Sequence, residues 1–124
     1  MLTLKFPAIA RPLALILAML LGTAQAQAHA RLVSCDPAPN TTVAAPMLIQ
    51  LHFSEDVARK FSSIRLTNPG GAAIAIMAMD AKDAKSLSIM PNVALAPGLY
   101  TITWVAVATD DGHKTTGTYT FTVK

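Results

Sequence analysis

Apolar and polar residues alternate over short runs through most of the chain, and turn-forming residues separate these runs. The run MLIQLHFS at 47–54 places Ile49, Leu51 and Phe53 on one face, because successive side chains of a strand point to opposite sides. Gln50 and His52 then fall on the other face. We find no convincing helical period. Short alternating runs between Pro, Gly, Asn and Asp residues are typical of an all-β sandwich or barrel.

Seven strands are predicted, at 31–35, 47–54, 62–68, 72–79, 86–90, 99–109 and 116–124. The sixth is the longest, and its inward face carries Trp104, which we expect to anchor the core. The preceding LAPGLY is similar to the tyrosine corner of Greek-key sandwiches, with Tyr100 at the corner. In the last strand Tyr119, Phe121 and Val123 should point inward. The predicted fold is an antiparallel, seven-stranded Greek-key β-sandwich or barrel of immunoglobulin-like type.

The first 28 residues differ from the rest and have the three parts of a secretory signal peptide. Lys5 and Arg11 are their only charged side chains, and the apolar run LALILAMLLG follows at 13–22. This run is far short of the roughly 20 residues that a membrane-spanning helix needs. A short membrane anchor or a buried helix is the alternative. Three Ala-x-Ala registers would leave Gln27, His29 or Arg31 as the first residue, and composition does not choose between them.

Charge and cysteine content narrow the classes of function. Removing Lys5 and Arg11 from the ten basic residues leaves eight against seven acidic ones, so the net charge of the remaining chain is about +1. No basic stripe indicates nucleic acid. The single cysteine, Cys35, excludes an intrachain disulfide. We expect Cys35 to be a buried strand residue. Its LVSC context is similar to a lipobox, but the apolar run does not lead directly into it, so lipidation is the minor alternative.

The predicted topology brings four polar residues to one end of the sandwich. The start of the first strand, the end of the second, the end of the sixth and the start of the seventh should meet there. These points carry His29, Glu55, Asp111 and His113. In TDDGHKT at 109–115, turn formation explains Asp110 and Gly112 but not His113. Asp111 and His113 are two residues apart and point the same way in an extended segment.

If His29 is the first residue, its amine and its imidazole can chelate one metal ion through two nitrogens. An α-amine has an ordinary pKa of roughly 7.7–8.0, so a metal can displace its proton near neutral pH. With His113 and Asp111 the donors become three nitrogens and one oxygen. A tetragonal set of this kind favours Cu(II). Zinc is the competitor, because it takes the same donors tetrahedrally.

Four segments, HARLVSCDPAPNTTV, LHFSEDV, LAPGLYTITW and DDGHKTTGTYTFTVK, span residues 29–124. In these segments the chain resembles the periplasmic copper-resistance protein CopC family. The resemblance implies a small Greek-key β domain that binds Cu(II), at 29–124, after a signal peptide at 1–28 that is cleaved behind Ala28. It also implies that His29, Asp111 and His113 are Cu(II) ligands. Glu55 matches an acidic family position, either as a further ligand or as a partner of the ligands.

Some members of that family carry a loop rich in Met and His that binds Cu(I). Here the corresponding region has only Met77 and Met79, with Met90 further on. We expect Met77 and Met79 to pack in the core and the protein to bind Cu(II) alone. His52 is interpreted as a solvent-facing or hydrogen-bonded strand residue, with a supporting role near Glu55 as the alternative.

The leading hypothesis is a monomeric periplasmic carrier or buffer of one Cu(II) ion, not an enzyme. By resemblance, its partner would be a CopD-like inner-membrane copper-resistance protein. Two alternatives remain: a copper-dependent oxidative enzyme with a histidine brace, and a metal-free structural sandwich. In the brace enzymes a coordination position stays open for oxygen, whereas Asp111 is expected to fill it here. No nucleophile elbow, phosphate loop or zinc-protease motif is present, so hydrolase functions have no support.

Overall fold

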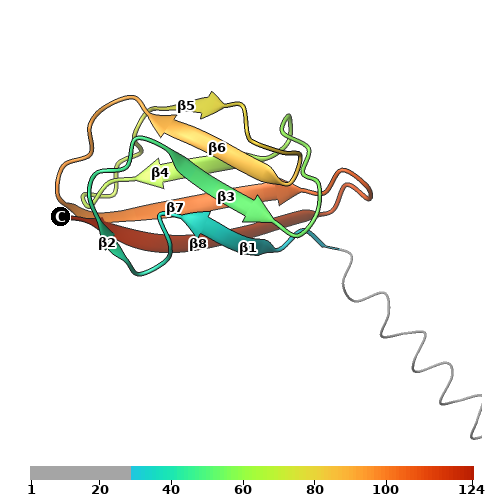
Figure 1. Cartoon of the computed structure of the whole chain (residues 1–124), viewed down its shortest axis with the longest axis horizontal. Helices are drawn as coiled ribbons and strands as arrows, with labels where there is room; N and C mark the ends of the chain where they lie inside the picture. The colour runs from blue at the N-terminus through green and yellow to red at the C-terminus, as the bar shows by residue number, and fades with distance from the viewer. Residues whose placement is uncertain (1–28) are drawn as a thin grey trace, which may run out of the picture.

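The computed structural model describes residues 29–124, and the predicted signal peptide lies outside the described residues. Two four-stranded sheets pack face to face (Figure 1). The first sheet, in spatial order, contains β1 (Leu32–Asp36), β3 (Ile49–Phe53), β6 (Ser86–Pro91) and β5 (Ile76–Met79). The second contains β2 (Thr42–Val43), β8 (Lys114–Val123), β7 (Gly98–Val107) and β4 (Ser63–Thr67). The all-β sandwich is confirmed. Within 29–124 no helix is long and apolar enough to cross a membrane.

Two details of the predicted strands are wrong. The two-residue strand β2 pairs in parallel with β8, so the structure has an eighth strand and one parallel pair. Two residues are too short a run for alternation to reveal. The predicted strand at 72–79 is divided, because Ile74 N–H donates to Leu66 O of the second sheet at 2.8 Å, before β5 joins the first sheet. The alternating pattern continues through this change of sheet, so the sequence does not reveal it.

The alternating faces form the core as expected. In β3, Ile49, Leu51 and Phe53 are buried, and β7 contributes a similar buried row. Trp104 packs edge-on against Phe53, with ring centroids 5.2 Å apart. Burying each large side chain of this kind contributes about 1.5–3 kcal/mol. The Tyr100 hydroxyl donates to Ala96 O at 2.7 Å, which confirms the tyrosine corner.

Four side chains are less buried than predicted. Cys35 and Tyr119 are half-buried at one edge of the sandwich, where they pack against the core instead of lying within it. Met77 is 56% exposed, so its expected core position is wrong. Its register explains this. Ala78 pairs with the buried Ile89 and follows the inward phase of β5, although Ala78 itself is exposed on this edge strand. Met77, which pairs with Met90, therefore follows the outward phase. Met79 also falls on the outward phase and is half-buried.

The four predicted strand ends meet at one end of the molecule (Figure 1). Leu32 at the start of β1 is paired with Phe53 at the end of β3. At the ends of the long hairpin, Val107 pairs with Lys114. Backbone bonds hold the segments here: Ala58 N–H, in the loop after β3, donates to Val107 O of β7 at 2.8 Å, and Ser54 N–H donates to Arg31 O at 2.9 Å, which extends the pairing of β3 with β1. The loops at this end are therefore held in fixed positions.

Candidate metal centre

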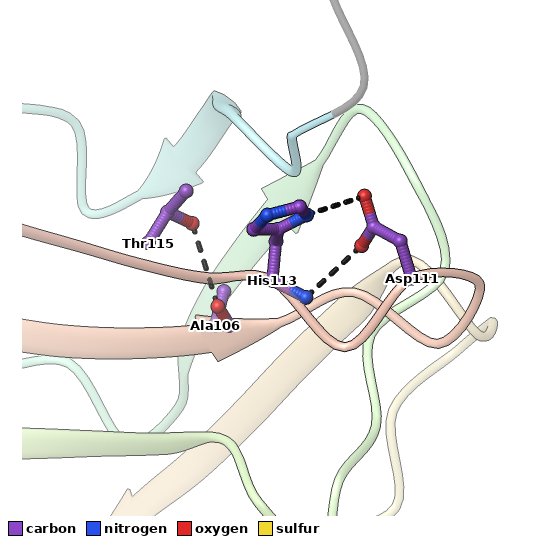
Figure 2. Close-up of polar contacts among 4 residues, drawn as sticks. All are labelled: Ala106, Asp111, His113 and Thr115. Atoms are coloured by element: carbon purple, nitrogen blue, oxygen red, sulfur yellow. Dashed lines mark hydrogen bonds and ion pairs between the residues drawn. The ribbon is translucent and has the colours of Figure 1, made fainter.

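The connection between β7 and β8 orients Asp111 and His113. Ala108 N–H donates to His113 O at 2.9 Å, and Gly112 N–H donates to Ala108 O at 3.0 Å, which closes the loop. Gly112 has a φ of 70°, in the left-handed region that glycine adopts without a Cβ penalty. Asp111 then accepts two bonds from His113, one from the backbone N–H at 3.0 Å and one at Nδ1 at 2.8 Å (Figure 2).

These contacts keep Asp111 ionised and orient the His113 ring. The hydrogen bond from the His113 side chain, followed by that from its backbone N–H, lowers the pKa of Asp111 below its ordinary value. The Asp111 carboxylate is therefore ionised at neutral pH and can only accept hydrogen bonds. His113 Nδ1 must donate to it, so Nε2 keeps the lone pair of the neutral ring. Both residues are exposed.

His29 reaches the same place from the start of β1. The carbonyl of the buried residue Ala30 accepts a bond from Thr115 Oγ1 at 2.8 Å, and Arg31 N–H donates to Ser54 Oγ at 3.0 Å. The chain leading into β1 is thus held on both sides. The His29 and His113 rings meet edge to face, with centroids 4.5 Å apart and an interplanar angle of 80°.

Three of the four predicted site residues come together. His29, Asp111 and His113 each offer one ligand atom, and these atoms all lie within 4.8 Å of one another. Among residues 29–124 no other group of three or more His, Cys, Asp or Glu side chains has this proximity. Glu55 is half-buried in the bend after β3 and is not part of this group. His52 is hydrogen-bonded, as one of its two interpretations predicted, through Nδ1 to Ser86 Oγ at 2.6 Å.

Sequence reasoning did not find Thr115. Its hydroxyl ties Ala30 to the second sheet and so positions His29. In sequence Thr115 is one of several threonines of the last strand, and nothing distinguishes it from the others. Only the three-dimensional structure distinguishes Thr115, which follows His113 by two residues and contacts the segment that leads into β1. The resulting cluster of two imidazoles and one carboxylate can hold a borderline divalent transition metal such as Cu(II) or Zn(II).

The structure is thus a small all-β sandwich with an exposed cluster of candidate metal donors at one end. The chain belongs to the CopC domain family, whose model matches residues 32–124. It is 41% identical over 107 residues to the copper resistance protein C of Escherichia coli, covering 80% of this chain and 84% of that protein. It is also 41% identical over 117 residues to the copper resistance protein C of Pseudomonas syringae pv. tomato, covering 89% and 92%.

A solved structure gives the same result. The crystal structure of PcoC, described as a methionine-rich copper resistance protein from Escherichia coli, matches with a TM-score of 0.72 and 41% identity. The match covers 78% of this chain and 100% of PcoC. Family and fold predicted from the sequence are therefore confirmed, and the relatives are named for copper resistance.

Proposed function

We propose that this protein binds one Cu(II) ion per chain and acts as a periplasmic carrier or buffer in copper resistance. The observation that carries the proposal is the His29, Asp111 and His113 cluster, with its ligand atoms within 4.8 Å of one another. Its nitrogen and oxygen donors suit Cu(II), which stands above zinc in the affinity order for a given site. The relatives named copper resistance protein C support the choice of copper.

The proposal includes cleavage behind Ala28. Cleavage turns the backbone nitrogen of His29 from an amide into an amine, which adds a third nitrogen donor to the cluster. Export to the periplasm follows from the signal peptide expected at 1–28. We further propose that the mature chain is a monomer and exchanges copper with a CopD-like inner-membrane protein. Exposure of all three clustered side chains is consistent with such exchange, because a partner can reach the ion.

An oxidative enzyme with a histidine brace would differ from the proposed binding site in one ligand. Asp111 lies within the cluster, where its carboxylate would take the position that a brace enzyme leaves open for oxygen. We therefore propose binding without turnover. Steady consumption of ascorbate by the copper-loaded protein, above that of free copper held by a chelator, would contradict this.

The experiment that tests the amine compares two chains, one starting at His29 and one starting at Ala28. Both keep every side chain of the cluster, but only the first has the amine on His29. We expect the longer chain to bind Cu(II) at least about tenfold more weakly, a loss of about 1.4 kcal/mol. Competition with a chromophoric chelator measures the affinity, and electron paramagnetic resonance counts the nitrogen ligands. Equal affinities would contradict the proposal.

Side-chain variants complete this test. His113→Ala should abolish high-affinity binding in the chain that starts at His29. Glu55→Gln separates the two roles considered for Glu55. A carboxylate ligand would change the copper spectrum when removed, whereas a partner outside the coordination sphere would leave the spectrum unchanged and alter affinity alone.

Equilibrium sedimentation of the copper-loaded chain tests the proposal that it is a monomer.

A further inference from the structure

His52 is the centre of a second polar arrangement, on the outer face of the first sheet. Its Nδ1 lies 2.6 Å from Ser86 Oγ, and Ser86 Oγ donates to Asp83 Oδ1 at 3.0 Å. A serine hydroxyl has one proton, and here Asp83 accepts it. His52 Nδ1 must therefore be the donor to Ser86. The neutral ring is held in one tautomer, with its lone pair on Nε2.

Asp83, the last acceptor of this series of hydrogen bonds, is fixed in place. Asp83 Oδ1 also accepts the Lys85 N–H at 2.9 Å, and the Arg59 guanidinium donates to Asp83 O at 3.0 Å. The hydrogen bond from Ser86 is the main cause that lowers the pKa of Asp83, so this carboxyl is ionised at neutral pH. Ser86 itself is buried, with 6% of its surface exposed. A metal-binding histidine characteristically donates its other nitrogen to such a carboxylate-linked partner, which raises the basicity of the ligating nitrogen.

Further oxygen donors surround the free face of His52. It lines a hollow of 430 Å³ together with Ser34, Asp36, Gln50 and Lys82. In the register of β1 and β3, Ser34 lies opposite His52 and Asp36 opposite Gln50. Residues directly opposite on antiparallel strands share a face, and diagonal neighbours such as His52 and Asp36 are about 7–8 Å apart, within bridging distance of one ion. Cys35 and Leu51, which lie opposite each other on the inward phase of the two strands, also line the hollow.

We propose that this hollow is a second site for a divalent transition metal, with His52 Nε2 and the Asp36 carboxylate as its main ligands. The Ser34 and Gln50 oxygens and water complete the coordination. Two carboxylates, Asp36 and Asp83, and one ammonium group, Lys82, line the hollow, so its net charge favours a cation. With one nitrogen donor the site binds Cu(II) more weakly than the cluster at His29. None of its residues belongs to that cluster, so the two sites stand or fall separately.

The test is a Cu(II) titration of the folded chain that starts at His29, continued past the first equivalent. We expect a second, weaker equivalent with a one-nitrogen resonance spectrum. His52→Asn should remove it and keep the first, and His113→Ala should do the reverse. Exposed Asp36→Asn should weaken it without disturbing the fold. Absence of a second equivalent, or its persistence in His52→Asn, would overturn the proposal.

The role of the His52–Ser86–Asp83 hydrogen bonds is tested by a separate variant with its own control. Ser86→Ala should weaken the second equivalent about 10–100-fold, the usual effect of removing a partner that orients a ligand. The matched variant Ser63→Ala, on the exposed face of β4, should leave both equivalents unchanged. Nitrogen-15 correlation spectra of the metal-free chain report the tautomer directly. A proton on Nε2 and a bare Nδ1 in neutral His52 would overturn the argument even if copper binds.

Discussion

The three histidines of the chain use their ring nitrogens according to the acceptor that each one meets. His113 donates directly to a carboxylate, Asp111, two residues away. His52 donates through a serine hydroxyl to Asp83, which is distant in sequence. His29 meets another imidazole instead, with its ring edge to face against His113. In the first two cases the hydrogen bond made by Nδ1 fixes the tautomer and leaves the lone pair of the neutral ring on Nε2.

Cys35 gives a prediction at the same scale. Burial is the main cause that raises the pKa of its thiol, and the Asp36 charge adds to the effect. A raised pKa leaves less thiolate at a given pH, and thiolate is the reactive form. Alkylation of the metal-free protein by iodoacetamide should therefore reach its half-maximal rate at a higher pH than alkylation of an unfolded chain, whose thiol has a pKa of about 8.5.

Mass spectrometry of time points across pH measures this, with the same protein in denaturant as the control. Asp36→Asn should move the midpoint back toward lower pH, because a neighbouring negative charge has been removed. A midpoint in the native protein at or below that of the denatured protein would show that the thiol is not shielded.

The hairpin of β7 and β8 depends on one close approach between its two strands. Trp104 and Gly117 are directly opposite each other in the register, and the indole ring lies over the glycine. A Cβ placed on Gly117 would collide with the Trp104 ring. Trp104 cannot move away freely, because it is buried against Phe53. The absence of a side chain at 117 is therefore a packing requirement of this pair.

Gly117→Ala should lower the free energy of unfolding by about 1–3 kcal/mol, the usual cost of adding volume to a packed core. Urea unfolding followed by Trp104 fluorescence measures it. Gly70→Ala is the matched control, since a Cβ there would meet only Asn68 Oδ1 at 3.4 Å and should change stability by less than about 0.5 kcal/mol. Equal losses in the two variants would contradict the packing argument.

Sequence alternation predicted the elements well where one face of a strand is buried throughout. This holds for β3 and β7, whose inward residues follow the period of two without a break. The prediction failed where strand pairing, and not burial of one face, determines whether a strand forms or which way a side chain points. The short strand β2 exists because Thr42 pairs with Thr122, and Met77 is outward because of its register with Met90. Partners so far apart leave no trace in a local pattern.

The candidate site was predictable to the same extent. Strand direction alone places His29, Asp111 and His113 at one end, and the structure brings their ligand atoms together. The exact reach of each side chain is set by loop geometry, which strand direction does not determine. Glu55 is at the expected end but outside the cluster, and the role of Thr115 depends on a bond to Ala30 across 85 residues of sequence.

At the scale of the whole molecule, the cluster joins the two sheets. His29 leads into β1, the edge strand of the first sheet, whereas Asp111 and His113 belong to the hairpin of the second. In the metal-free protein, the bond from Thr115 to Ala30 already links these parts. An ion held by all three side chains would fasten the edge strand of one sheet to the central hairpin of the other. Copper binding should therefore stabilise β1 more than it stabilises the rest of the sandwich.

This predicts two measurable effects of Cu(II) on the chain that starts at His29. Ligand binding to the folded state adds about 2.7 kcal/mol at a free ion concentration a hundred times the Kd, and for a domain of this size each kcal/mol raises Tm by about 4–8 °C. Amide hydrogen exchange should slow most at Leu32–Asp36, since opening β1 then requires release of the ion. To leave out the second site proposed at His52, both effects are measured in the His52→Asn variant, where adding His113→Ala should abolish them. Equal protection of β1 and of the distant strand β5 would show that the ion stabilises the fold without joining the sheets.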